Sequence, residues 1–331
     1  MTEELVVGLT FRIDDALIAE IEAVDPRIRT LRLFEISGRQ EPDAETKARL
    51  LEQIATVEVL MGTSGTPREY FEAATRLRWF QSINAGVERL EREGVLGLGF
   101  AVTSGAGIAS VAIAEWILGM MVMLTKNLHV YVRQQTEAHW ESRRSGELAG
   151  KTVGIVGLGA IGRATATRCR AFGMRVIASR RTVLAGSSDP DCDVVLPYSA
   201  LPQLLDEADY VVLSLPLTAE TRGLIGAPEL ARMKATAFLL NVARGDVVDQ
   251  AALITALKTG TIAGAGLDVT SPEPLPAESE LWALPNLILT PHMSGNVEGY
   301  GHKAAGVFVA NLRRYVAGAP LEHLANPSLG Y

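Results

Sequence analysis

The segment KTVGIVGLGAIG, residues 151–162, decides the fold of this chain. An apolar run, Val153–Val156, leads directly into Gly157, Gly159 and Gly162, and a helical pattern follows. In the spacing G-x-G-x-x-G, the first glycine permits a tight turn, the second lets the backbone approach a pyrophosphate, and the third allows close helix packing. The start of the helix adds free N–H groups and a partial positive charge. This strand–turn–helix context predicts a dinucleotide-binding unit.

Apolar runs alternate with amphipathic stretches on both sides of this segment. Strands that alternate with helices indicate parallel βαβ units, because a parallel pair needs a crossover connection. The predicted class is therefore α/β, with two doubly wound, parallel-sheet domains. The expected strands are Leu5–Leu9, Leu31–Ile36, Val57–Met61, Trp79–Ile83, Phe100–Thr103, Val153–Val156, Arg175–Ala178, Val211–Leu215, Ala237–Asn241, Gly264–Val269 and Leu287–Leu289. The expected helices are Ala16–Val24, Ala44–Ile54, Arg68–Thr75, Val87–Glu93, Ile161–Phe172, Leu253–Lys258 and Gly299–Ala317.

A long apolar stretch, Gly105–Thr125, lies between the two series and contains one charged residue, Glu115. Its length would suit a membrane span. However, the stretch occurs once, carries its charge near the centre and has no marked Lys/Arg asymmetry at its flanks. We therefore expect a helix buried against protein, at a domain or subunit interface, and no membrane association.

The length and charge of the chain limit the classes of function that it can have. The 331 residues favour two domains, since single cores stop growing near about 250–300 residues. The net charge is −7 and the pI about 5.4, which argues against a nucleic-acid partner. Cys169 and Cys192 form neither a disulfide framework nor a metal-ligand spacing, so no metal site is expected. The N-terminus shows no secretory signal, and a reducing cytoplasm is the expected compartment.

The end of the next strand indicates which dinucleotide binds. An NAD site usually carries an acidic residue about 20 residues after the glycines, which accepts hydrogen bonds from the ribose. This chain instead reads ASRRT at 178–182, with no Asp or Glu before Asp189. Ser179, Arg180 and Arg181 present a hydroxyl and guanidinium groups, and arginine suits a phosphate. The pattern predicts NADP as the preferred coenzyme, with NAD as a possible second.

Four further segments carry polar residues in a characteristic order: QSINAGVE at 81–88, NVARGDVVD at 241–249, GLDVTSPEP at 266–274 and TPHMSGN at 290–296. Each alone is modest evidence, because an arginine after a strand or a single histidine often has only a structural role. Together with the glycine motif, they closely resemble the D-isomer-specific 2-hydroxyacid dehydrogenase family. The resemblance covers nearly the whole chain and is strongest to the NADP-using branch that includes glyoxylate/hydroxypyruvate reductases.

The resemblance implies an oxidoreductase that transfers a hydride between NADP(H) and a small 2-keto acid or D-2-hydroxy acid. It implies a substrate-binding domain, residues 1–101 plus 295–331, and a Rossmann domain, residues 102–294, with the active site in the cleft between them. It also implies a homodimer formed through the nucleotide domain. The helix expected at 107–126 lies in that region, in agreement with its interpretation as an interface.

The family's catalytic residues fall on Arg244, Glu273 and His292. Arg244 can clamp a carboxylate and a carbonyl oxygen in a bidentate fork. His292 is the candidate proton donor, and Glu273 would favour its charged form and fix its tautomer. Keto-acid reduction should then be fastest at mildly acidic pH. The backbone N–H groups of Ala85 and Gly86 should meet the substrate carboxylate.

Other positions match coenzyme-binding residues of the family. The pyrophosphate should contact Ala160, Ile161 and Ser110, in addition to the three glycines. The remaining residues are expected along the adenosine, phosphate and nicotinamide, with Asp268 accepting from the carboxamide: Leu215, Pro216, Thr221, Val242, Ala243, Asp268, His292 and Gly295.

Two other functions remain open on the sequence alone. The same fold and the same three catalytic residues could act on another donor such as phosphite; formate is disfavoured because that branch has Gln where this chain has Glu273. A non-catalytic protein that senses dinucleotides could also keep these residues. Neither the particular keto acid nor the role of His139 and Trp140 follows from the sequence.

Overall fold

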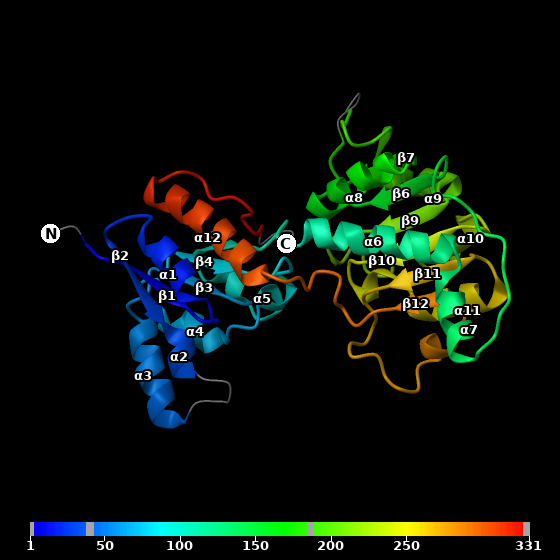
Figure 1. Cartoon of the computed structure of the whole chain (residues 1–331). Helices are drawn as coiled ribbons and strands as arrows, with labels where there is room; N and C mark the ends of the chain where they lie inside the picture. Colours follow the sequence, from blue (N-terminus) through cyan, green and yellow to red (C-terminus); the bar gives the residue numbers. More distant parts are fainter. Residues whose placement is uncertain (1–2, 38–42, 184–187, 327–331) are drawn as a thin grey trace. The chain divides into compact units, whose positions relative to one another are not determined.

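The computed structural model describes residues 3–37, 43–183 and 188–326. The chain forms two compact units (Figure 1), Met1–Ile108 with Glu298–Tyr331, and Ala109–Val297. Each unit contains one sheet in which all strand pairs are parallel. The predicted α/β class with two parallel-sheet domains is confirmed.

The first unit is a sheet of five strands with helices on both faces. Its strands are β1 (Leu5–Leu9), β2 (Ile28–Arg32), β3 (Val59–Gly62), β4 (Trp79–Ser82) and β5 (Ala101–Thr103). Its helices are α1 (Asp15–Glu22), α2 (Leu33–Ser37), α3 (Ala44–Ile54), α4 (Arg68–Ala73), α5 (Glu88–Arg92), the 3₁₀ turn η1 (Val95–Gly97) and α12 (Tyr300–Val316). The strand order is β2-β1-β3-β4-β5, so the chain reverses its direction of travel across the sheet between β1 and β3.

The second unit has seven strands in the order β12-β11-β10-β9-β6-β7-β8. Their bounds are β6 (Thr152–Val156), β7 (Arg175–Arg180), β8 (Val194–Pro197), β9 (Tyr210–Leu213), β10 (Phe238–Asn241), β11 (Gly264–Leu267) and β12 (Leu287–Leu289). The helices are α6 (Ser110–Thr125), α7 (Leu128–Thr136), α8 (Ala160–Ala171), η2 (Tyr198–Ala200), α9 (Leu201–Glu207), α10 (Ala227–Arg232), η3 (Gly245–Val247), α11 (Gln250–Thr259) and η4 (Glu280–Ala283).

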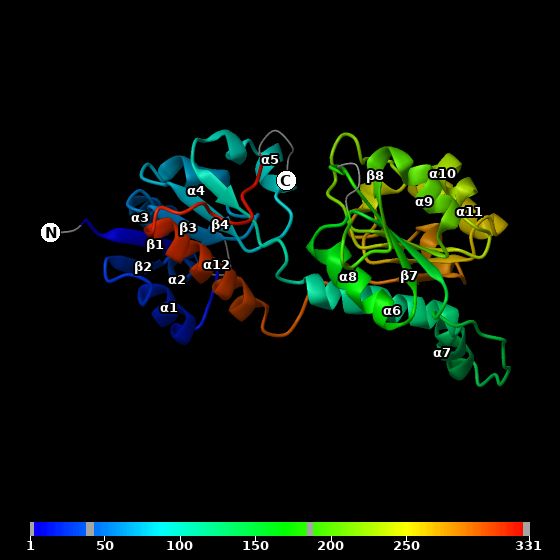
Figure 2. The same cartoon turned by 90° about the horizontal axis from the view of Figure 1, so that it is seen from above.

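Each sheet is buried on both faces, as parallel sheets usually are. In the second unit, α6 and α8 cover one face, and α9, α10 and α11 cover the other (Figure 2). In the first unit, α1 and α12 pack on one face and α3, α4 and α5 on the other. The C-terminal helix belongs to the first unit because Phe308 on α12 is fully buried and stacks on Trp79 of β4, with ring centroids 5.2 Å apart.

One expected strand is wrong. The chain at Leu31–Ile36 is not a single strand: β2 ends at Arg32 and α2 begins at Leu33. Short apolar runs do not distinguish a strand from a buried helix, and here the fully buried Leu33 belongs to the helix. Besides α2 and the 3₁₀ turns, four elements of the described chain were not expected from the sequence. They are α7, β8, α9 and α10, which are short or mostly polar.

The apolar helix is α6, a single helix of 16 residues. Within the described ranges, no single helix is long and apolar enough to cross a membrane. Among the described helices, only α6 and α7 taken together reach the length and apolar character of a membrane span. These two helices are bent by 69° relative to each other. Ile117, Met121 and Leu124 of α6 are buried in the core that α6 shares with α8.

Candidate active site

Apart from Ser110, the sequence-predicted residues of the second unit lie at or after the carboxyl ends of its parallel strands. Because these strands are parallel, their carboxyl ends lie at one edge of the sheet. The chain reverses its direction of travel between β6 and β9, and such a switch point is where open α/β sheets bind ligands. The structure thus brings the glycine turn, the Arg180 region, the Arg244 loop, Asp268 and His292 to one edge.

The glycine turn joins β6 to α8 and needs glycine at two of its three positions. Gly157 has φ of 104°, a left-handed conformation, and a Cβ there would lie 2.5 Å from the carbonyl oxygen of Ser214. A Cβ on Gly162 would lie 2.3 Å from the carbonyl oxygen of Gly157. The turn is also held by the Ser214 hydroxyl, which donates to the Gly157 carbonyl at 2.8 Å. Any side chain at these two positions would therefore push the strand, turn and helix apart.

Gly159 differs, because a Cβ built on it would meet no atom of the described chain within 4 Å. It directly precedes α8, whose first turn contains no acidic residue and no side-chain cap. Gly159 and Ala160 are exposed and Ile161 is half-buried. The backbone N–H groups of this helix start are thus open to an approaching anion, as a pyrophosphate site requires.

The end of β7 carries two buried polar atoms without hydrogen-bond partners in the described chain, Ser179 Oγ and Arg180 Nε. Buried polar groups are nearly always paired, so an unpaired hydroxyl and an unpaired guanidinium Nε–H at a strand end suit a ligand that supplies acceptors. Arg181 follows on the surface. The donor set fits a phosphate on the adenosine ribose.

The first acidic residue after the glycine turn is engaged elsewhere. Asp189, which is almost fully buried, pairs with Arg163 of α8, with Nη1 and Oδ2 2.5 Å apart. Burial alone would raise the pKa of this carboxyl, but hydrogen bonds from Asp191 and Arg163 and the charges of Arg163 and Arg180 hold the pKa below its ordinary value. Asp189 is therefore a charged partner of arginine in this structure.

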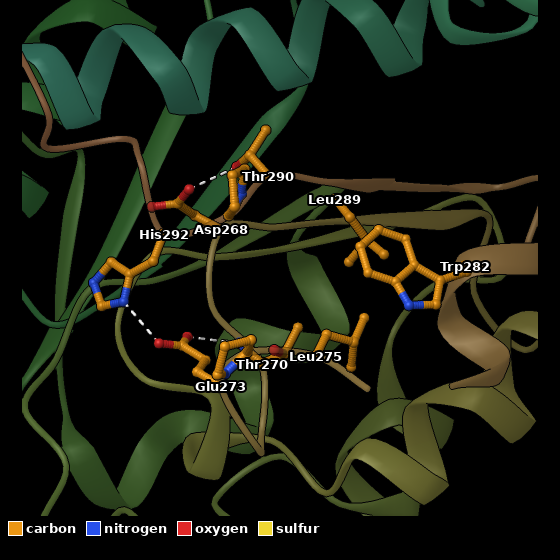
Figure 3. Close-up of a pocket in the computed structure, with 10 residues that line it drawn as sticks. Asp268, Thr270, Glu273, Leu275, Trp282, Leu289, Thr290 and His292 are labelled. Atoms are coloured by element: carbon orange, nitrogen blue, oxygen red, sulfur yellow. Dashed lines mark hydrogen bonds and ion pairs between the residues drawn. The ribbon is translucent and has the colours of Figure 1, made fainter. Parts of the chain in front are cut away.

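His292 and Glu273 form the central pair of the site (Figure 3). Nδ1 of His292 lies 2.9 Å from Oε2 of Glu273, and the side chains are 50% and 38% exposed. The other carboxylate oxygen, Oε1, accepts from the backbone N–H of Thr270 at 3.0 Å. Since an ionised carboxylate can only accept, Nδ1 carries the hydrogen, and Nε2 is the nitrogen left for a substrate.

Asp268 holds the loop that carries His292. Its Oδ1 accepts from the Thr290 hydroxyl at 2.6 Å and the Met293 N–H at 2.9 Å. Its Oδ2 accepts from the N–H and hydroxyl of Ser294 at 2.9 and 2.5 Å. The backbone N–H of His292, at φ of 49°, donates to the Asp268 carbonyl at 2.8 Å. These five bonds keep His292 in a left-handed conformation that a non-glycine residue seldom adopts.

Arg244 follows β10 in a loop braced by Asn241. The Asn241 side chain donates to the Arg244 carbonyl at 3.0 Å and accepts from the Ala243 N–H at 3.0 Å. Nη1 of the half-buried Arg244 side chain donates to the Ala243 carbonyl at 2.7 Å. A Cβ on Gly245 would lie 2.0 Å from the carbonyl oxygen of Thr270, so this loop packs directly on the loop after β11.

A cavity of about 650 Å³ opens beside the His292–Glu273 pair. Figure 3 shows Leu275, Trp282 and Leu289 together on one side of it, and the polar pair on the other. Its remaining lining residues are Asp268, Thr270, Pro274, Thr290 and Pro291. The site thus combines an acid–base pair with an apolar wall.

The other predicted coenzyme residues lie at the same edge of the second unit. Leu215, Val242 and Ala243 are buried directly after β9 and β10, and Pro216 is half-buried. Thr221 closes the loop after β9, since its hydroxyl donates to the Pro216 carbonyl at 2.8 Å and accepts from the Thr218 N–H at 2.7 Å.

Two further predicted residues lie near α6, and two lie in the first unit. Ser110 begins α6, and a Cβ on Gly295 would lie 3.4 Å from the Cβ of Ala109, the residue before Ser110. Ala85 and Gly86 follow β4, at the carboxyl edge of the five-stranded sheet. Ala85 is exposed there and Gly86 half-exposed.

Sequence reasoning missed several residues that build the site. Thr270, Thr290 and Ser294 donate to the two key carboxylates, and Trp282 and Leu289 line the cavity. Only their proximity to His292 and Glu273 in the sequence could have suggested them, because serine, threonine and leucine near a strand end are common for many reasons.

Comparison with known proteins identifies the family. Residues 118–294 match the model of the D-isomer specific 2-hydroxyacid dehydrogenase NAD binding domain. A glyoxylate reductase of Korarchaeum cryptofilum is 33% identical over 304 residues, which span 88% of this chain and 90% of that one. A D-3-phosphoglycerate dehydrogenase of Methanocaldococcus jannaschii is 34% identical over 85% of this chain, which spans only 54% of that relative.

Solved structures agree with this result. A D-isomer specific 2-hydroxyacid dehydrogenase from Xanthobacter autotrophicus, crystallised with NADPH and MES, is 31% identical and aligns over the full length of both chains with a TM-score of 0.82. The chain belongs to the D-isomer specific 2-hydroxyacid dehydrogenase family. The predicted class, an oxidoreductase that links NAD(P) to the interconversion of 2-keto and 2-hydroxy acids, is confirmed.

The glycine turn gives a direct test of coenzyme placement. Gly159→Ala should leave the free energy of unfolding unchanged or slightly higher, because the methyl group enters open space. If the pyrophosphate approaches Gly159 as the motif predicts, the methyl group would stand in its path, and the same variant should bind NADPH at least about tenfold more weakly. Fluorescence titration with NADPH and urea unfolding measure the two quantities.

The matched variant is Gly162→Ala, whose Cβ would collide with the Gly157 carbonyl. It should lower the free energy of unfolding by about 1–3 kcal/mol. Normal NADPH affinity in Gly159→Ala would contradict the placement of the pyrophosphate at this turn.

Proposed function

We propose that this protein is an NADP-preferring reductase of small 2-keto acids such as glyoxylate and hydroxypyruvate. The observation that carries the proposal is the His292–Glu273 pair, which lies at the same sheet edge as Arg244 and the open glycine turn. Relatives that share about one third of this sequence are named glyoxylate reductases, which supports a small keto acid.

The proposed roles follow from the chemistry of each side chain. Reduction of a 2-keto acid needs a cation for the carboxylate, a proton donor for the carbonyl oxygen and a hydride, which bound NADPH would supply. Arg244 would bind the carboxylate and carbonyl oxygens through its guanidinium. The N–H groups of Ala85 and Gly86 would also donate to the carboxylate. In its doubly protonated form, His292 would donate the proton from Nε2 to the carbonyl oxygen as the hydride adds to the carbonyl carbon, which leaves a neutral imidazole. Glu273, which accepts from Nδ1, would stabilise the charged ring before the transfer.

Coenzyme preference is proposed from the end of β7. Ser179 Oγ and Arg180 Nε lack partners in the described chain, and a 2′-phosphate would provide acceptors for both. Asp189 is already paired with Arg163, so it is not free to accept hydrogen bonds from a ribose as the acidic residue of an NAD site does. The Xanthobacter relative was crystallised with NADPH, in agreement with this preference.

Within this proposal, the first unit binds the substrate and the second binds the coenzyme with the catalytic residues. The proposal includes a homodimer formed through the second unit and a cytoplasmic location. Exposed apolar side chains on α6, α7 and the following segment support an interface there. These are Val111, Leu128, Val132 and Trp140, the last of which is fully exposed.

Replacement of Arg180 and Arg181 together by alanine tests the coenzyme assignment. Loss of charged hydrogen bonds to the 2′-phosphate should raise the Michaelis constant for NADPH by at least about tenfold. The constant for NADH should change little, because NADH lacks that phosphate. Arg175→Ala, at the opposite end of β7, is the matched control and should alter neither. Equal effects on the two coenzymes would contradict the assignment.

Replacement of His292 by alanine tests the proton donor. Turnover of glyoxylate should fall by about 10²- to 10⁴-fold, the usual contribution of general acid catalysis. NADPH binding, followed by fluorescence, should remain measurable. His302→Ala provides the control, because this histidine pairs with Asp14 in the first unit and has no proposed role. Retained turnover in His292→Ala would place the proton donor elsewhere.

A further inference from the structure

Two loops of the first unit are joined by a side-chain amide. Ser64 follows β3 and Asn84 follows β4, so both lie at the carboxyl edge of the five-stranded sheet. Oδ1 of Asn84 accepts from the backbone N–H of Ser64 at 2.8 Å and from the Ser64 hydroxyl at 3.2 Å. This edge also carries Ala85 and Gly86.

These contacts fix the orientation of the Asn84 amide. A backbone N–H can only donate, so the atom of Asn84 that faces Ser64 must be the oxygen, and its two lone pairs are both used. The Nδ2 amino group, with two hydrogens, makes no hydrogen bond to the described chain. Asn84 is half-buried, so this amino group is a donor that the fold itself does not use.

The backbone around Asn84 is equally well held. The Asn84 N–H donates to the hydroxyl of the fully buried Ser82 at 3.1 Å, and its carbonyl accepts from the Gly105 N–H at 2.8 Å. The preceding carbonyl, of Ile83, accepts from the Tyr300 hydroxyl of α12 at 2.6 Å. Together with Ser64, the bonds from Gly105 and Tyr300 come from three parts of the chain that are distant in sequence. They therefore preorganise this turn before any ligand binds.

We propose that Asn84 is a substrate-binding residue whose Nδ2 amino group donates to the carboxylate of the 2-keto acid. Ser64 is the positioning residue, because its two bonds to Oδ1 leave Nδ2 as the end of the amide that can meet a ligand. The Nδ2 hydrogens would act beside the N–H groups of Ala85 and Gly86, so that the turn after β4 would offer several neutral donors to one carboxylate. This inference rests on the proposed function, since it names a further contact for the same substrate.

The decisive variant is Asn84→Asp. Aspartate keeps an oxygen for Ser64 to bond, so the loops stay joined and thermal unfolding should be unchanged. It replaces the donor by an anionic oxygen, which should raise the Michaelis constant for glyoxylate by at least about tenfold. The turnover number and the Michaelis constant for NADPH should change by less than about threefold, because the lost contact is made in the ground state and the transition state alike.

Two variants accompany it. Ser64→Ala removes one of the two bonds that orient the amide. It should raise the Michaelis constant for glyoxylate by a smaller factor, about two- to fivefold. Gln53→Glu makes the same amide-to-carboxylate change on α3 of the first unit, in the turn that leads to the opposite edge of the sheet. It should leave every constant unchanged.

Oxamate, a non-reducible analogue of a 2-keto acid, supplies a readout that does not depend on turnover. Calorimetric titration of oxamate into the protein with NADPH should show binding that Asn84→Asp weakens by a similar factor. The inference about Asn84 would be overturned if Asn84→Asp kept both its Michaelis constant for glyoxylate and its affinity for oxamate within twofold of wild type. A wild-type protein that reduces no 2-keto acid would instead contradict the proposed function, and the oxamate titration would still decide whether Asn84 binds a carboxylate.

Discussion

The buried carboxylate of Asp268 is the constraint on which the catalytic geometry depends. An ionised carboxylate without partners in the protein interior would cost several kcal/mol, but here Thr290, Met293 and Ser294 supply four donors. All four donors belong to the chain immediately around His292. The same bonds that satisfy the charge therefore hold His292 in its left-handed conformation and direct its ring at Glu273. Both oxygens of Asp268 already accept these four bonds, and the contact with the nicotinamide carboxamide that the family resemblance implies stays a prediction.

At the predicted coenzyme end of the site, some polar and charged groups are paired within the protein and others have no partner in the described residues. Arg163 and Asp189 neutralise each other, which ties α8 to the chain before β8. Ser179 Oγ and Arg180 Nε are left without partners in the described residues. A fold rarely leaves buried donors unpaired without a use for them, and an incoming phosphate would meet that need. The chain has no Asp or Glu between the glycine motif and Asp189, and Asp189 is paired with Arg163. The acidic residue that accepts hydrogen bonds from the ribose in an NAD site therefore has no counterpart here.

The sequence was most informative where local chemistry dictates structure. Gly157 and Gly162 stand where any side chain would collide with backbone, so their spacing predicts the turn and the parallel sheet around it. It was least informative where the outcome depends on contacts between distant segments. Leu33 turns out to begin a helix, since an apolar run fits either a strand or a buried helix. The bond between Ser64 and Asn84 joins two loops 20 residues apart, and no pattern of residue types predicts it.

The central claim is that these groups together reduce a small 2-keto acid with NADPH. Its most direct test is to follow the initial rate of NADPH and NADH oxidation side by side, with glyoxylate, hydroxypyruvate, pyruvate, phenylpyruvate and 2-ketoisocaproate as substrates. The account predicts rapid oxidation of NADPH with the smallest acids and a much weaker signal with NADH. Silence with every acid and both coenzymes, in protein that still binds nucleotide, would contradict it and point to a different donor or to a sensing role.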